Sequence, residues 1–190
     1  MNIVCATTAF NAYHETPSVL VLPERTSLEN LADAQSRWPN AIIVGAIAEG
    51  CHIRGYAYHL GKNRIDYLKY CSDGESVGVG EAVRTQTYEI EDLIVGVLIC
   101  RDFRDSPLRE PLLHRLAQSH ARMKVVCLPS DMDSSWFPSH ELREFPGCYV
   151  AMSNNARDVT STRRESFIAG PNGQYLITQS NHDTIATVAP

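Results

Sequence analysis

Residues 94–107 read IVGVLICRDFRDSP and change character abruptly at Cys100. The residues before it are apolar or Gly, which is typical of a buried strand. Charged residues follow at once, beginning with Arg101 and Asp102. Functional groups of layered α/β proteins gather where strands end at the carboxyl edge of a sheet. The stretch therefore predicts a buried strand that delivers a cysteine to its tip, followed by a sharp turn into a helix.

Short apolar runs alternate with helix-like segments along the rest of the chain. Residues 27–38 carry apolar residues at helical spacing, and Ser27 is placed to begin that helix. Residues 106–121 predict a second helix, in which Pro111 should cause a kink or a late start. Further strands are predicted at NIVCATTAF (2–10), SVLVLPE (18–24), AIIVGAIAE (41–49), KVVCLPS (124–130) and CYVAMSN (148–154).

Two segments have the pattern of β-hairpins. Residues 52–70 alternate and turn at Gly61-Lys62-Asn63, and residues 165–180 turn at Pro171-Asn172-Gly173. Internal repeats and Gly/Ser linkers are absent from the sequence. Strands mixed with two or three helices predict one α/β layered domain over residues 1–190.

Composition narrows the classes of function. The formal net charge of -5 argues against a nucleic-acid or anionic-membrane partner, because phosphate binding requires a basic face. No apolar run approaches the roughly 20 residues that span a bilayer. The N-terminus reads as a strand and not as a signal peptide, so we expect a cytoplasmic protein.

Six cysteines are scattered singly, without a C-x-x-C pair, which predicts reduced thiols and neither a metal site nor a disulfide framework. Most should be buried filler. Cys100 differs because backbone N–H groups and a helix N-terminus at its turn favour a thiolate. A thiol nucleophile needs a base, and His is the usual one. None of the seven histidines lies at a strand tip, so a Cys–His pair stays open without a preferred candidate.

A carboxylate and an amine are better placed. Glu24 ends the apolar run SVLVLPE, and Lys69 lies in an alternating segment, on the same side as Ile65 and Tyr67. Each has an ordinary alternative: Glu24 as a charge at a helix N-terminus, and Lys69 as a solvated strand residue.

Taken together, these residues resemble the nitrilase (carbon–nitrogen hydrolase) superfamily. Its signature is a strand ending in Pro-Glu, a strand ending in Tyr-x-Lys, and a strand ending in Gly-x-x-x-Cys-x-Asp. Here they stand as LVLPE (20–24), DYLKY (66–70) and GVLICRD (96–102). The resemblance extends to residues 114–130, 145–156 and 166–176, and so covers almost the whole chain.

The resemblance implies a four-layer α-β-β-α sandwich and a cysteine hydrolase of a non-peptide carbon–nitrogen bond, acting without metal or cofactor. Cys100 would be the nucleophile, Glu24 the general base and Lys69 the cation that stabilises the oxyanion. The substrate would be a linear amide or carbamoyl group, with a nitrile less favoured. Homo-oligomers, usually dimers, are implied as well.

The resemblance also implies substrate-binding residues. A second Glu should precede the nucleophile, and Glu75 is preferred to Glu81 because of its spacing from Cys100. Asn154 could line the pocket. Independently of the resemblance, an Arg side chain directed into the pocket could recognise a carboxylate, and the candidates are Arg84, Arg101, Arg104 and Arg143.

Departures from the family pattern leave an alternative open. Only about ten residues separate the first strand from the Pro-Glu strand, so the family's long first helix should be short or absent, and Pro146 stands where helix is expected. The alternative is a non-catalytic binding or subunit protein that retains a reactive thiol.

Overall fold

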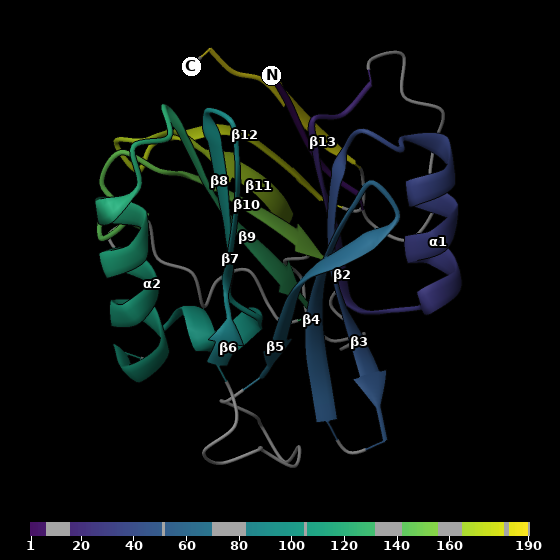
Figure 1. Cartoon of the computed structure of the whole chain (residues 1–190). Helices are drawn as coiled ribbons and strands as arrows, with labels where there is room; N and C mark the ends of the chain where they lie inside the picture. The colour runs from purple at the N-terminus through teal and green to yellow at the C-terminus, as the bar shows by residue number, and fades with distance from the viewer. Residues whose placement is uncertain are drawn as a thin grey trace.

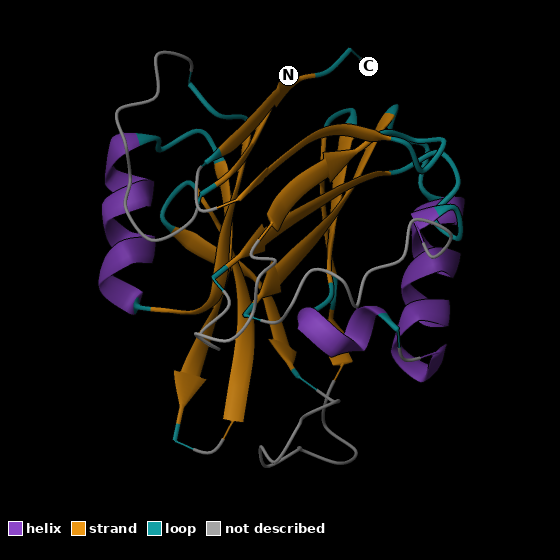
Figure 2. Ribbon diagram, turned by 180° about the vertical axis from the view of Figure 1, so that it is seen from behind, coloured by secondary structure: helices purple, strands orange, loops and turns teal. Residues whose placement is uncertain are grey.

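Two β-sheets face each other, and one helix covers the outer surface of each (Figures 1 and 2). The structure is a computed structural model and describes residues 1–6, 16–50, 52–69, 83–104, 106–131, 142–155, 165–180 and 183–189. Apolar side chains from both sheets form the central core, and each helix seals a smaller core against its own sheet. The architecture is the α-β-β-α sandwich that the sequence predicts.

Among the described residues, the first sheet holds seven strands and the second six. Strands β1, β2 and β3 are parallel to one another, as are β8, β9 and β10, while the other pairs are antiparallel. In spatial order the first sheet contains β13 (Thr184–Thr187), β1 (Asn2–Cys5), β2 (Val19–Thr26), β3 (Ile42–Glu49), β4 (His52–His59), β5 (Lys62–Leu68) and β6 (Val83–Thr85). The second contains β12 (Tyr175–Ser180), β11 (Glu165–Ala169), β10 (Tyr149–Asn154), β9 (Met123–Ser130), β8 (Leu93–Val97) and β7 (Thr87–Ile90).

Helix α1 (Leu28–Arg37) lies on the first sheet, as predicted. The Ser27 side chain caps it by accepting a hydrogen bond of 3.0 Å from the Asn30 backbone N–H. Its Leu31 and Ala34 are buried and pack against apolar residues of β1 to β3. The amphipathic spacing and the Ser27 cap therefore explain why this segment forms a helix.

Helix α2 (Ser106–Gln118) lies on the second sheet and contains Pro111. The expected late start is wrong, because the helix already begins at Ser106. Pro111 has no backbone N–H, so the second turn of the helix loses one hydrogen-bond donor. Leu108, before Pro111, and Leu112 and Leu116, after it, are buried against the sheet and hold the helix in place. Neither α1 nor α2, the helices of the described residues, has the length and hydrophobicity that a membrane crossing requires.

Strand β8 ends at Val97, three residues before Cys100, so the expectation of a strand running to the cysteine is wrong at its end. Val97 packs between the sheets and Leu98 packs toward α2. Gly96 allows the close approach of the helix, because a Cβ there would lie 2.6 Å from Leu112 Cδ1. Residues 98 and 99 are also buried although they lie beyond the strand, so their apolar side chains give the same sequence pattern as β8 itself.

Both predicted hairpins form. The first turns at Leu60-Gly61, where both residues have positive φ, one residue earlier than expected; His59 pairs with Lys62. Two left-handed residues match the twist of the flanking strands. The second hairpin turns at Asn172-Gly173, between β11 and β12, as predicted.

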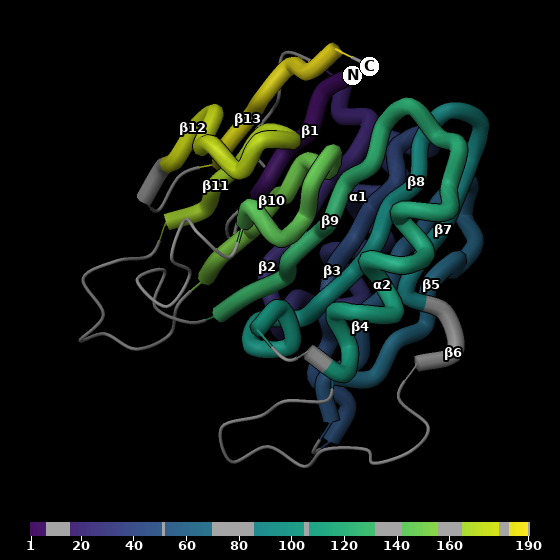
Figure 3. Tube along the Cα trace, turned by 90° about the vertical axis from the view of Figure 1, so that its left-hand side faces the viewer, coloured from purple at the N-terminus to yellow at the C-terminus, as the bar shows by residue number. Residues whose placement is uncertain are grey.

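The carboxyl ends of the parallel strands of both sheets meet at the end of the sandwich opposite the chain termini (Figures 1 and 3). The candidate site lies there.

Candidate active site

Strand β2 brings Glu24 into the space between the sheets through an irregular backbone. Its pairing with β3 shifts register on both sides of Glu24, and Arg25 adopts a φ of 60°. Such bulges re-aim side chains at the ends of strands. Glu24 is only 2% exposed, although the residues before it along β2 are apolar. A carboxylate buried among apolar residues needs a partner, and the next strand tip supplies one.

Lys69 is that partner. It follows the last residue of β5, and its backbone N–H bonds to the carbonyl of Ile53 at 2.9 Å. Lys69 is buried with Ile65 and Tyr67, which confirms that the three residues share one side. Its Nζ donates a hydrogen bond of 2.6 Å to Glu24 Oε1. The other oxygen, Oε2, is buried without a hydrogen-bond partner among the described residues, so it is available to a third group.

Cys100 begins a 3₁₀ helix, Cys100–Phe103, two buried residues after the end of β8, and its φ is 49°. A left-handed backbone is strained for a residue with a side chain and persists where the surroundings impose it. Asp102, fully buried, receives a hydrogen bond from the Tyr67 hydroxyl and thereby ties the turn to β5. The structure thus confirms the sharp turn into a helix that the sequence predicts.

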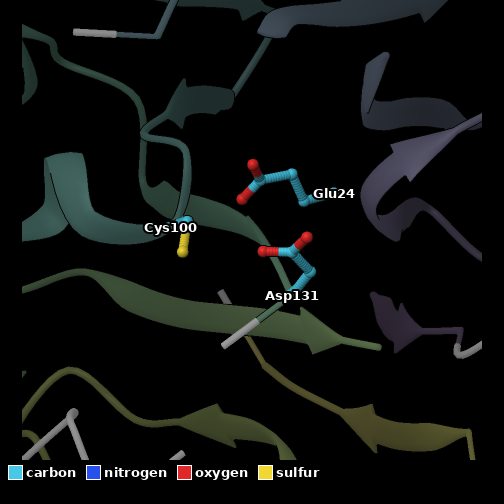
Figure 4. A group of neighbouring side chains, drawn as sticks. All are labelled: Glu24, Cys100 and Asp131. Carbon is cyan, nitrogen blue, oxygen red and sulfur yellow. The ribbon is translucent and has the colours of Figure 1, made fainter. Parts of the chain in front are cut away.

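The side chains of Glu24 and Cys100 converge with that of Asp131, as Figure 4 shows. One potential ligand atom from each lies within 4.8 Å of the other two. The Ser130 hydroxyl donates to Cys100 Sγ at 3.7 Å. Ser130 and Asp131 were not singled out from the sequence as site residues. The available signal was their place directly at the end of the apolar strand β9.

Burial keeps Cys100 protonated at rest. It raises the pKa of the thiol to about 12, and the Glu24 carboxylate adds to that rise. Three groups act in the opposite direction and favour thiolate: the Lys69 ammonium, the Asp131 backbone N–H and the Ser130 hydroxyl. The thiol is therefore a poor nucleophile until a base takes its proton.

Glu24 has the properties of that base. Burial raises its pKa above the ordinary value of 4.5, and the Lys69 ammonium limits the rise. Lys69 stays charged, because the Glu24 carboxylate and other neighbours outweigh burial and raise its pKa. A carboxylate whose pKa is shifted toward neutrality is a more effective proton acceptor near pH 7.

The same three side chains raise the question of a metal ion, since a thiol and two carboxylates are possible ligands. Both carboxylates already face cations, however. Lys69 bonds to Glu24, and Arg25 Nε lies 3.2 Å from Asp131 Oδ2. These fixed positive charges oppose a divalent cation, so the arrangement suits proton transfer and oxyanion stabilisation better.

The other predicted site residues are distributed differently. Asn154 is 2% exposed at the end of β10, and its backbone N–H bonds to Ser166 Oγ. Arg101 is exposed, in the turn that begins at Cys100. Glu75 and Glu81 lie outside the described residues.

Comparisons with known proteins identify the fold. No family model matches the amino-acid sequence, and no curated protein sequence is similar enough to count as a relative. Saccharomyces cerevisiae Nit3, a member of branch 10 of the nitrilase superfamily, matches with a TM-score of 0.67 at 15% identity, over 97% of this chain and 88% of that one.

An amidase from Nesterenkonia sp. matches with a TM-score of 0.67 at 17% identity, over 97% of this chain and 88% of that one. A mutant of the same amidase in complex with butyramide matches equally well. At these identities the likeness concerns the fold. The chain has the nitrilase fold, in agreement with the resemblance of its motifs.

Proposed function

We propose that this protein is a cysteine-dependent hydrolase of a non-peptide carbon–nitrogen bond, with a linear amide or a carbamoyl compound as substrate. The observation that carries the proposal is the convergence of Glu24, Lys69 and Cys100 at one end of the sandwich, from three separate strand ends. The nitrilase fold and the active-site cysteine named in neighbouring amidase structures support it.

In the first half of the reaction, the Cys100 proton passes to Glu24 as Sγ attacks the amide carbon. Negative charge develops on the carbonyl oxygen. The Lys69 ammonium and the backbone N–H of Arg101 are the groups proposed to meet it, because preorganised positive groups stabilise an oxyanion most in a buried site. Protonated Glu24 then gives its proton to the nitrogen, the C–N bond breaks, and ammonia or an amine leaves.

In the second half, a water molecule loses a proton to Glu24 and attacks the thioester. The C–S bond breaks, the acyl group leaves as a carboxylic acid, and Cys100 regains its proton. One carboxylate serves both halves, because it is regenerated when the amine departs.

The substrate class follows from the chemistry of the thiol. An amide or carbamoyl carbonyl yields the thioester directly, whereas a nitrile first forms a thioimidate, so a nitrile is the less favoured substrate. Butyramide, which is bound in a mutant Nesterenkonia amidase, is a suitable first probe.

The experiment is ammonia release from butyramide, an N-carbamoyl amino acid and butyronitrile, with Cys100→Ala as the control. We expect release from at least one carbonyl compound by the unmodified protein and none by Cys100→Ala. Release that persists in Cys100→Ala would rule out the thiol mechanism. If no compound is hydrolysed while Cys100 remains reactive, the non-catalytic alternative is favoured.

A further inference from the structure

We propose that Arg25 and Asp131 form a positioning pair for the nucleophile: Arg25 holds Asp131 and neutralises its carboxylate, so that the Asp131 backbone N–H stabilises the Cys100 thiolate. The proposal rests on the proposed function for its catalytic meaning. The pair joins the two sheets, since Arg25 lies on β2 and Asp131 follows β9.

The backbone of β2 is distorted in the way this contact requires. Successive side chains of a regular strand point to opposite faces. Glu24 and Arg25 are adjacent, yet both reach toward the second sheet: one to Cys100 and the other to Asp131. The left-handed φ of 60° at Arg25 and the shifts of register around Glu24 make this possible. Strain of this kind persists where tertiary contacts hold it.

Asp131 acts on Cys100 in two opposed ways. Its backbone N–H bonds to the sulfur and favours thiolate. Its carboxylate lies within 4.8 Å of the sulfur and of a Glu24 oxygen, where negative charge opposes thiolate formation. Figure 4 shows this side chain directed at the same space as Glu24. A cation bound to the Asp131 carboxylate would offset its negative charge and leave the backbone N–H in place to stabilise the thiolate.

Arg25 supplies that cation at 3.2 Å, and both side chains are mostly shielded from solvent, at 26% and 18% exposure. Partly buried pairs are screened less than surface pairs, so the neutralisation is effective at the sulfur. Within the described part of the chain, the other charged or polar groups that act on Cys100 are Glu24, Lys69 and Ser130. The Asp102 carboxylate behind the turn is occupied by the Tyr67 hydroxyl.

The test measures alkylation of Cys100 by iodoacetamide across pH, with peptide mapping to assign the rate to this cysteine. Because no amide is turned over, the test stands even if the hydrolase proposal fails. For Arg25→Met we expect the rate at each pH between 7 and 9 to fall about tenfold, which corresponds to a rise of about one unit in the pKa of the thiol.

Two companion variants separate charge from structure. In Arg25→Met/Asp131→Asn, the loss of both charges should return the rate to within about twofold of the unmodified protein. Arg25→Lys, which keeps the charge, should retain the rate, and Arg25→Gln is the neutral replacement if Arg25→Met does not fold. Arg109→Met is the matched control, because it breaks an ion pair of 2.8 Å between Arg109 on α2 and Glu144, and neither residue is among the groups that shift the pKa of Cys100.

A rate of alkylation that stays unchanged in Arg25→Met between pH 7 and 9, with the same loss of melting temperature as Arg109→Met, would show that the pair is structural only. A double variant as slow as Arg25→Met would also overturn the proposal, because the Asp131 charge would then not be the cause.

Discussion

Cys100 follows strand β8 and Cys127 lies in the neighbouring strand β9, and both thiols are buried, which raises both pKa values. They differ in their surroundings. Cys127 lies within β9 in the apolar core, where burial is the cause of its raised pKa. Cys100 lies just beyond the end of β8, with Glu24, Lys69 and Asp131 around it.

The comparison shows which surroundings set Cys100 apart from a buried structural cysteine. Burial alone produces an inert thiol. Cys100 lies three residues past the end of β8, where it meets groups from the ends of other strands. In the proposed mechanism, one of these groups accepts the thiol proton and the others stabilise the charge that the reaction creates. The difference therefore lies in position relative to the strand ends.

The largest expected effect is on turnover after each cysteine is replaced. Cys100→Ala should lower amide hydrolysis by about 10⁴-fold or more, because the nucleophile is lost. Cys127→Ala should retain hydrolysis within about twofold, because residue 127 supplies none of the groups proposed for the reaction. Ammonia release and circular dichroism on both variants check this. Equal losses of hydrolysis in the two folded variants would show that Cys100 has no special role compared with Cys127.

The next effect concerns the base. Glu24→Gln keeps the shape of the side chain but removes its capacity to accept a proton. It should lower turnover by about 10²- to 10⁴-fold. The control is Glu29→Gln on the exposed face of α1, which should leave turnover unchanged. Full activity in a folded Glu24→Gln protein would mean that another group deprotonates Cys100.

A smaller effect should appear in thiol labelling of the native protein. Iodoacetamide should modify Cys100 at least about 100-fold faster than Cys127, because Cys127 is fully buried and reacts only after local opening. The Cys100 rate should rise with pH, since its pKa is raised to about 12. Peptide mapping separates the two rates, and comparable labelling at both positions would contradict the assigned environments.

The smallest effect is on stability at alkaline pH. The folded pKa of each thiol is raised above 9.0, so its contribution to stability is present below pH 9 and is lost as pH rises toward the folded value. Removing one thiol should reduce the slope of unfolding free energy against pH above pH 9 by about 1.4 kcal/mol per pH unit. Denaturant titrations of Cys100→Ala and Cys127→Ala measure it. An unchanged slope would show that the replaced thiol ionises equally in both states.

Much of this arrangement was predictable from the sequence because local patterns carry it. Apolar runs fixed the strands, Ser27 marked the start of α1, and the motif resemblance named Glu24, Lys69 and Cys100. The sequence predicts the end of β8 too late, because residues 98 and 99 are as apolar as the strand itself. They are apolar because they stay buried after the strand has ended.

Asp131 and Arg25 were missed as a pair for a different reason. Their contact joins two sheets and depends on the left-handed backbone at Arg25, and no periodicity in the sequence signals either feature. The same holds for the bond from Tyr67 to Asp102, which links residues 35 positions apart.

Peptide mapping after acid quenching of the reaction with a hydrolysed amide, such as butyramide, tests most directly whether hydrolysis passes through a thioester at Cys100. We expect an acyl group on the peptide that contains Cys100, lost on treatment with hydroxylamine and absent from Cys100→Ala. Ammonia release without that adduct at Cys100, or with the acyl group on another residue, would contradict the thioester mechanism.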